Sequence, residues 1–381
     1  MNTYPELKTK ARMPYLDNVR SMVIILVIVM HSAVTYSGIG DWYYKEGSFD
    51  ELPLIEKIFF GYLQMFLQSW FMGILFFISA FFAAKALAKR GTLQFIKERL
   101  FRLGLPLLIY MFVISPLIGL VLLKFYPEIS LLENYCWYIT SFEWTGSTGP
   151  LWFVEALLIF CIVYAIVKKC FKTTLKIQTI KTKNIIFVII ATGVIAFCVR
   201  LIFPIGTSYY NLQFCYFTSY IVLFILGIIA GENDLLDNLV KDSNTKWIQW
   251  TLIIGMPLWV CIIIFSGAID GNTPFEGGLN WPSFAYALWE SLTAIGFSIG
   301  ILSFFKKRIN FENNYTKIIS DNSFGIYFLH APLLISVSLI LKYLIIDPIL
   351  KFLLVVIITF FVCLIVSFLL KKIKPVGVLL K

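Results

Sequence analysis

The chain has 381 residues, of which 59% are apolar and only 14% are charged. Soluble domains carry roughly a quarter of charged residues, so this composition excludes an ordinary soluble protein and indicates a polytopic membrane protein. The net charge of +10 comes from basic residues in short segments between apolar runs, without one basic face. We therefore expect topology signals and no nucleic-acid partner.

Apolar runs of about 20 residues, the length that crosses a bilayer core, recur along the whole chain. They predict an all-α protein with about ten transmembrane helices, at residues 19–37, 58–84, 103–123, 151–167, 185–203, 214–231, 248–266, 284–305, 323–345 and 348–370. The segment 131–144 is expected to be a re-entrant or interfacial helix instead of a span.

Basic residues are concentrated in alternate connections between the predicted spans. Of the 32 Lys and Arg residues, 26 fall on one side, which the positive-inside rule places in the cytoplasm. We therefore expect cytoplasmic tails at 1–14 and 371–381 and a single domain at 15–370, embedded in the cytoplasmic membrane and in contact with its lipid.

The connections on the other side, 38–57 and 267–283, are acidic, aromatic and rich in Gly and Pro. Carboxylates and aromatic faces suit a carbohydrate or another polar acceptor. The alternative is an aromatic belt at the membrane interface with ordinary turns.

The first predicted helix carries two ionisable residues into the membrane. Arg20 and His31 are eleven residues apart, so they share one helical face with Asp17 and are offset by roughly 16 Å along the axis. Such residues within a membrane helix indicate function, and a neutral imidazole can act as a general base. The alternative is that Arg20 only reaches the interface and that His31 packs against another helix.

Two more arginines, Arg99 and Arg102, are three residues apart at the predicted cytoplasmic end of the third span. They share a helical face, and together with Arg20 they would place three guanidinium groups at this side. Arginine suits bidentate contacts with phosphate, so the three predict a phosphate-bearing cytosolic donor. The alternative is that these arginines only hold this side of the protein in the cytoplasm, as the positive-inside rule describes.

The fourth span opens with the motif Gly149-Pro-Leu-Trp-Phe-Val-Glu155. Glu155 lies about one turn below the predicted external surface and needs a partner or a wet cavity there. It could orient His31, hold an acceptor or pair with Arg200. Glu290 in the eighth span is a weaker candidate of the same kind.

The ninth predicted span begins with a polar stretch in which Asp321 and Ser323 are expected to cap the helix. Tyr327 and His330 share a face further along. Because Pro332 frees a main-chain carbonyl, His330 has a ready hydrogen-bond partner and is a candidate for a structural histidine.

The seven cysteines show neither C-x-x-C nor Cys/His metal spacing, so we expect no disulfide framework and no metal site. The chain also lacks an internal repeat, which counts against a transporter built from inverted halves.

Four segments in this order resemble acyltransferase family 3, the polytopic membrane O-acyltransferases. They are Tyr15-Leu-Asp-Asn-Val-Arg20 followed by His31, the Arg-x-x-Arg of Arg99 and Arg102, Gly149-Pro-Leu-Trp-Phe-Val-Glu155, and Ser323-Phe-Gly-Ile-Tyr-Phe-Leu-His330. The first of these, Trp42-Tyr-Tyr and Gly-Pro-Leu-Trp are most similar to the branch that contains the succinyltransferase of periplasmic glucans.

The resemblance implies a ten-helix domain that takes an acyl group from cytosolic acyl-CoA, acetyl-CoA or succinyl-CoA, and delivers it to a hydroxyl of an extracytoplasmic glycan or lipid-linked glycan. It implies that His31 is the catalytic histidine and that Arg20, Arg99 and Arg102 bind the donor. Glu155 is added as a second catalytic candidate. Substrate-binding or structural candidates are Asp17, Trp152, Tyr327 and His330.

The alternative function is a transporter or flippase that moves a glycan, lipid or acyl donor without covalent chemistry. For the enzyme, no hydrolase-like domain follows the membrane domain in this sequence. A relay of the acyl group to a second active site would therefore need a partner protein.

Overall fold

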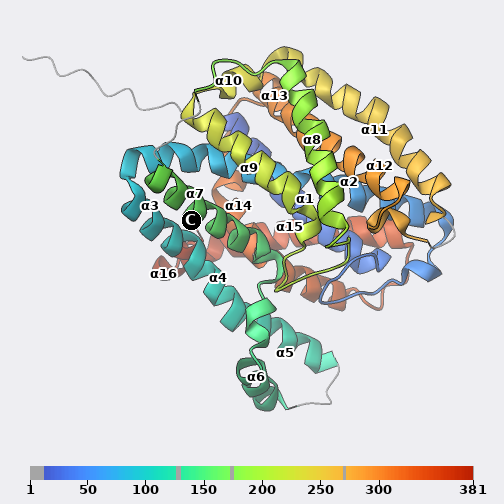
Figure 1. The fold of residues 1–381 in the computed structure, drawn as a ribbon. Helices are drawn as coiled ribbons and strands as arrows, with labels where there is room; N and C mark the ends of the chain where they lie inside the picture. Colours follow the sequence, from blue (N-terminus) through green and yellow to red (C-terminus); the bar gives the residue numbers. More distant parts are fainter. Residues whose placement is uncertain (1–12, 126–129, 172–175, 269–271, 381) are drawn as a thin grey trace, which may run out of the picture.

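A computed structural model describes residues 13–125, 130–171, 176–268 and 272–380. Within these ranges the protein is a bundle of α-helices (Figure 1), as predicted, and its only strand-like pairing is an isolated bridge between Tyr209 and Leu212. Most of the expected N-terminal tail, residues 1–12, lies outside the described residues, as do residues 269–271 of one predicted external connection.

Ten helices in the described part of the chain are long and apolar enough to cross a membrane, which confirms the predicted number. They are α1 (Pro14–Ser37), α2 (Leu54–Arg90), the continuous α3 (Thr92–Arg99), α4 (Leu105–Ile109) and α5 (Ser115–Phe125), α7 (Trp152–Phe171), α8 (Thr182–Arg200), α9 (Phe217–Glu232), α11 (Lys246–Phe265), the continuous α12 (Trp281–Ser291) and α13 (Ser298–Arg308), α14 (Asn314–Ile340) and α15 (Pro348–Leu370).

Two of these membrane helices contain π-helical turns and yet remain continuous. Leu100–Gly104 and Tyr110–Ile114 join α3, α4 and α5, and Leu292–Phe297 joins α12 to α13. A π-helical turn widens the helix locally and often lies at a functional site. Tyr110, the first residue of the second turn, belongs to the candidate site described below.

Helix α14 begins nine residues before the predicted start of the ninth span. Its N-cap is Asn313, whose side-chain oxygen accepts a hydrogen bond from the Thr316 amide at 2.9 Å. The expectation that Asp321 and Ser323 cap this helix is therefore wrong, because the free amides that a cap satisfies lie a full two turns earlier. The polar stretch before Ser323 is a helical extension.

The short helix α6 (Leu131–Thr140) lies outside the ten spans, as expected for the segment 131–144. Ten residues of helix extend only about 15 Å, about half of a bilayer core. Figure 1 shows α5 and α6 projecting from the bundle. Whether α6 is re-entrant or interfacial stays a prediction.

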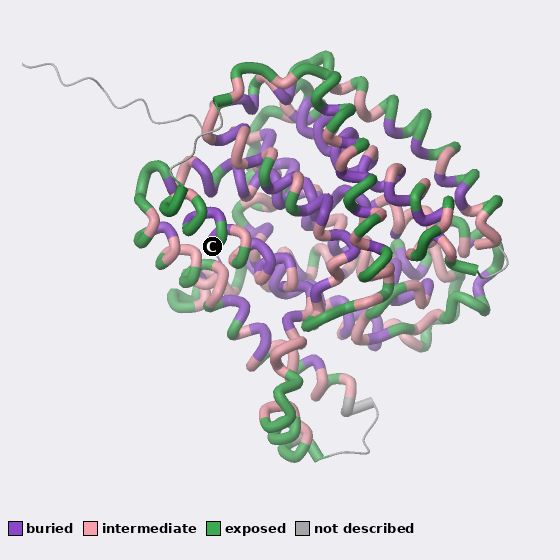
Figure 2. The backbone as a smooth tube through the Cα atoms, in the orientation of Figure 1, coloured by how far each residue is buried: buried purple, intermediate pink, exposed green. Residues whose placement is uncertain are grey.

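The core of the bundle lies between its central helices, where Figure 2 shows the buried residues concentrated. The apolar windows of α2 and α14 are 72% buried, whereas those of α11 and α15 are only 22% buried. The outer helices therefore expose apolar side chains along their length, which is the surface that contact with lipid requires.

Two glycines let α9 pack directly against the backbone of α2. A Cβ atom at Gly227 would lie 2.3 Å from the Phe77 carbonyl oxygen, and one at Gly231 would lie 2.7 Å from that of Phe81. Only glycine permits this approach, and a spacing of four residues puts both on one face of α9. This Gly-x-x-x-Gly pair therefore allows the close packing of α9 along α2.

Ion pairs gather the basic connections at one end of the bundle, here called the basic end. They join lysines near the C-terminal ends of α2, α7 and α13 to the last residue of α9 and to the segment after it, which includes α10 (Leu236–Leu239). The pairs are Lys85–Asp234 at 2.8 Å, Lys168–Glu232 at 2.8 Å and Lys306–Asp237 at 2.7 Å. The start of α1 lies there too, because the Asn18 side chain donates to the carbonyl oxygens of Ile309 and Phe311. After α15 the chain forms the short helix α16 (Lys374–Leu379).

The connections at the opposite end also contact one another. Lys351 at the start of α15 forms an ion pair with Glu46, which follows α1. The Ile205 amide donates to the Glu276 carbonyl oxygen at 2.9 Å. The predicted alternation of basic and acidic connections therefore matches the two ends of the bundle.

Candidate active site

The two histidines of the chain lie against each other, one on α1 and one on α14. His330 Nε2 lies 3.1 Å from His31 Nδ1, and the two rings are nearly parallel at an angle of 23°. His330 is fully buried, whereas His31 is only half-buried. The sequence predicts each histidine as a candidate, and the structure brings them together.

Trp42 covers the ring of His31. The two ring centroids are 4.0 Å apart at an interplanar angle of 18°. The loop after α1 is folded back because the Thr35 carbonyl oxygen accepts hydrogen bonds from the amides of Glu46 and Gly47. Trp42 Nε1 is buried and has no hydrogen-bond partner within the described ranges. A free N–H donor therefore lies on the residue that covers the imidazole.

The next residue, Tyr43, packs against the Gly-Pro turn that precedes α7. Its hydroxyl lies 3.4 Å from that of Tyr110, and burial raises the pKa of Tyr43, so the Tyr43 hydroxyl keeps its proton. Gly149 has a φ of +49°, and a Cβ atom on it would lie 2.2 Å from Tyr43 Oη. Glycine is therefore favoured at this turn both by its backbone conformation and by the close approach of Tyr43.

Tyr327 joins α14 to the same turn and also holds His330. Its hydroxyl donates a hydrogen bond to the Pro150 carbonyl oxygen, and its own carbonyl oxygen lies 2.5 Å from His330 Nδ1. Asn211 binds the turn from another side, because its amide donates to Thr148 Oγ1 at 2.8 Å and to the Gly149 carbonyl oxygen at 2.7 Å. The sequence analysis did not identify Asn211, which lies in an irregular connection without a motif.

Glu155 and Trp152 lie on α7 but form no hydrogen bond or ring contact with either histidine in the structure described. One carboxylate oxygen of Glu155 is buried without a hydrogen-bond partner among the described residues. Trp152 stacks on Tyr220 at a centroid distance of 5.6 Å. The alternative that Glu155 pairs with Arg200 is wrong, because α8 packs against α12 and Arg200 pairs with Glu290.

The three candidate donor-binding arginines fall on two helical segments. Arg20 on α1 is exposed and lies 3.4 Å from Asp17. Arg99 places its guanidinium group 5.0 Å from the centre of the Phe95 ring, and Arg102 is exposed. No hydrogen bond or ion pair between described residues joins Arg20 to the other two, so a cluster of three stays a prediction.

The predicted face of α1 between Arg20 and His31 is packed. Ile24 and Val27, the two residues of that face between them, are only 9% and 2% exposed. The face therefore presents its polar groups at two separate levels, with Arg20 near the basic end and His31 about six residues before the opposite end of α1.

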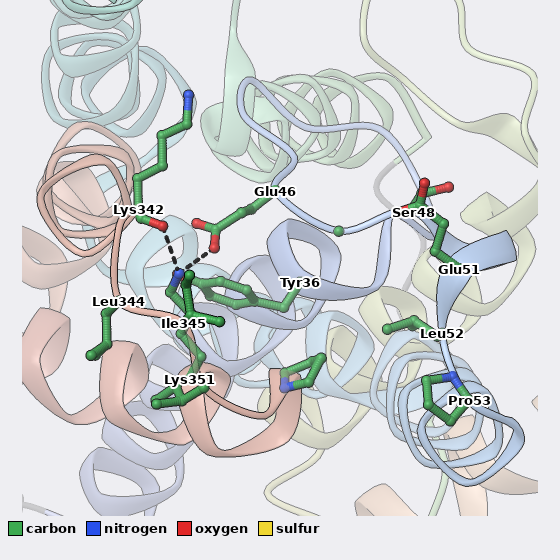
Figure 3. Close-up of a pocket in the computed structure, with 13 residues that line it drawn as sticks. Tyr36, Glu46, Ser48, Glu51, Leu52, Pro53, Lys342, Leu344, Ile345 and Lys351 are labelled. Carbon is green, nitrogen blue, oxygen red and sulfur yellow. Dashed lines mark hydrogen bonds and ion pairs between the residues drawn. The ribbon is translucent and has the colours of Figure 1, made fainter.

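A pocket of about 320 Å³ lies beside the opposite end of α1 (Figure 3). It is lined by residues of the connections 46–53 and 342–348, and by Lys351, which pairs with Glu46 and donates to the Lys342 carbonyl oxygen at 3.2 Å. Its volume is at the lower limit of small-molecule sites. Tyr36, which lines it, is five residues along α1 from His31, so the two are about 7.5 Å apart along the axis and about 140° apart around it.

Chemically, the site offers an imidazole pair and an indole N–H that has no hydrogen-bond partner among the described residues. In the part of the chain that the structure covers, no group of three His, Cys, Asp or Glu side chains could hold a metal ion. Such an arrangement can accept a proton from a bound hydroxyl and donate a hydrogen bond to a polarised oxygen.

The model of acyltransferase family 3, described as an acyltransferase domain, matches residues 13–368. The match runs from the residue before α1 into the last turn of α15, and it includes both histidines. Neither a curated protein nor a solved structure gives a significant match to the chain. Because the family model covers nearly the whole chain, this multi-pass membrane protein belongs to acyltransferase family 3 and is an acyltransferase.

Proposed function

We propose that this acyltransferase transfers an acetyl or succinyl group from cytosolic acyl-CoA to a hydroxyl of an extracytoplasmic glycan or lipid-linked glycan, in the cytoplasmic membrane. The observation that carries the proposal is the contact of His31 with His330 near one end of the bundle, on a helix whose other end bears Arg20. A proton acceptor and a phosphate-binding group thus lie at opposite ends of α1.

The direction of transfer follows from the distribution of charge. The basic end of the bundle carries most of the Lys and Arg residues, and the positive-inside rule places such an end in the cytoplasm. Acyl-CoA, a cytosolic compound with several phosphate groups, would therefore meet Arg20, Arg99 and Arg102 first. The histidine pair would face the acceptor side.

In the reaction, His31 takes the proton of the acceptor hydroxyl while the hydroxyl oxygen attacks the thioester carbonyl carbon. The carbon–sulfur bond then breaks, and the leaving CoA thiolate takes the proton from His31. The products are an ester and CoA, with no net change in oxidation state. A positioned general base contributes about 10²- to 10⁴-fold to the rate of such a step.

Trp42 supplies a hydrogen bond to the carbonyl oxygen as negative charge develops on it. Its Nε1–H is buried without a partner among the residues described, and its ring lies 4.0 Å from that of His31. A donor that is already desolvated and held in place stabilises an oxyanion more than the ground-state carbonyl.

The pocket beside Tyr36 supports a polyhydroxylated acceptor. The carboxylates of Glu46 and Glu51 and the hydroxyl of Ser48 line it, and Lys351 neutralises Glu46 through their ion pair (Figure 3). Carboxylate and hydroxyl oxygens accept hydrogen bonds from sugar hydroxyls. Membership of an acyltransferase family and continuous membrane helices both favour this chemistry over transport without covalent chemistry.

The test is acyl transfer by membranes that contain the wild-type protein or His31→Gln. With acetyl-CoA or succinyl-CoA as the donor, CoA release is expected to fall by about 10²- to 10⁴-fold in the variant. Mass spectrometry of envelope glycans from a deletion strain identifies the acyl group, because the missing acyl mass returns with the wild-type gene and not with His31→Gln. Unchanged turnover in a folded variant would overturn the proposal.

A further inference from the structure

The hydrogen bonds around the histidine pair determine where each ring carries its proton. The Tyr327 carbonyl oxygen, 2.5 Å from His330 Nδ1, can only accept a hydrogen bond. His330 Nδ1 must therefore carry the hydrogen. In a neutral imidazole the other nitrogen, Nε2, then has a lone pair and can only accept.

The same reasoning extends from His330 to His31. His330 Nε2 is an acceptor and lies 3.1 Å from His31 Nδ1, so His31 Nδ1 must donate the hydrogen bond between them. When His31 is neutral, its Nε2 is then the unprotonated nitrogen. The Tyr327 carbonyl thus sets the proton position of His330 and, through the hydrogen bond between the rings, that of His31; the Val27 carbonyl on α1 also accepts a hydrogen bond from the His31 ring.

We infer that His330 is a positioning residue that holds His31 in the tautomer whose Nε2 is basic. The Tyr327 carbonyl is the fixed starting point, because the Tyr327 hydroxyl also binds the Pro150 carbonyl oxygen and ties this part of α14 to the turn before α7. The catalytic consequence rests on the proposed function, whereas the tautomer itself does not.

This arrangement also supports His31 during proton transfer. When Nε2 takes the proton of an acceptor hydroxyl, His31 becomes a cation, and its Nδ1–H bond to neutral His330 becomes a charge-assisted hydrogen bond. His330 accepts this hydrogen bond through its Nε2 lone pair, while its own Nδ1–H stays on the Tyr327 carbonyl. A fully buried neutral imidazole fills this role without placing a second charge in the membrane.

The direct test uses the fact that the chain contains only two histidines. Solid-state NMR of the protein with ¹⁵N-labelled histidine rings and a purification tag free of histidine gives one pair of ring-nitrogen signals for each residue. We expect a protonated Nδ1 and an unprotonated Nε2 for both, with His330→Gln used to assign the signals of His31. A wild-type His31 with its proton on Nε2 would overturn the inference, whatever its activity.

The kinetic test compares three side chains at position 330. His330→Leu removes the acceptor, and we expect kcat to fall at least about tenfold while KM for acetyl-CoA stays within about twofold. His330→Gln, whose amide oxygen can accept from His31 Nδ1–H, is expected to recover part of the loss. A folded His330→Leu variant with wild-type kcat would overturn the positioning role. If instead His31→Gln is fully active, the proposed function fails while the NMR result still decides the tautomer.

Discussion

The bundle contains two polar pairs that differ in charge and in access. Arg200 and Glu290 form an ion pair that is almost completely enclosed, with exposed fractions of 0% and 2%. His31 and His330 are uncharged in the hydrogen-bonded arrangement described, and His31 remains half-buried. One pair is a closed contact between charges, and the other includes a histidine that is only partly buried.

The surroundings of the two pairs show the same difference in enclosure. The guanidinium group of Arg200 lies 5.1 Å and 5.8 Å from the ring centres of Tyr286 and Tyr216, so aromatic faces complete its enclosure. Beside His31, Trp42 instead keeps an N–H group without a partner in the structure described. The charged pair within the membrane is thus a structural contact, whereas the histidine pair forms the proposed active site.

The largest expected effect comes from breaking the ion pair. Glu290→Leu leaves Arg200 as an uncompensated buried charge, which costs about 3–5 kcal/mol of stability. Thermal unfolding of the purified protein in detergent measures the loss. The double variant Arg200→Met with Glu290→Leu should recover most of it and retain acyl transfer. A folded double variant without activity would show that the pair belongs to the active site.

The second prediction concerns the histidine pair and the indole N–H group of Trp42. Trp42→Phe keeps an aromatic ring over His31 but removes the N–H group, and we expect kcat to fall about 10²-fold with KM for the donor little changed. Trp137→Phe is the control, because Trp137 is 58% exposed on α6. Equal turnover of Trp42→Phe and Trp137→Phe would contradict the role of the indole.

The third prediction uses two glycines with positive φ to separate strain from crowding. Gly149→Ala combines backbone strain with a clash against Tyr43 Oη and should lower stability by about 2 kcal/mol. Gly206→Ala at φ +89° has open space around the new atom and should cost only about 1 kcal/mol. Unfolding midpoints give both values. The rate of acyl transfer should fall in Gly149→Ala and not in Gly206→Ala. Equal rates in the two variants would show that the turn at Gly149 does not support the active site.

Much of the fold follows from hydrophobic length and charge. A run of about 20 apolar residues must be helical in lipid, because no water is present to satisfy its backbone groups, and the basic connections identify one end. The start of α14 could not be predicted in this way, since residues 314–322 are mostly polar and extend the helix beyond the apolar window.

The site was predictable as single residues and not as an arrangement. His31 is unusual within an apolar helix, and the Gly149 turn and His330 belong to recognisable motifs. The contact between His31 and His330 joins positions 299 residues apart and depends on the packing of α1 against α14. Whether Arg200 pairs with Glu155 or with Glu290 likewise depends on which helix packs beside α8. No local sequence pattern predicts that packing.

The smallest expected effect lies far from both pairs, at the basic end. Arg102 is exposed and forms no ion pair with any residue described, so Arg102→Gln should leave stability and kcat nearly unchanged. If it contacts a donor phosphate, KM for acyl-CoA should rise up to about tenfold. Arg308→Gln removes the same charge from another exposed position at this end and is the matched control. An equal rise of KM in both variants would indicate general electrostatic attraction of the donor, whereas a rise in Arg102→Gln alone would place the phosphate at the π-helical turn after α3.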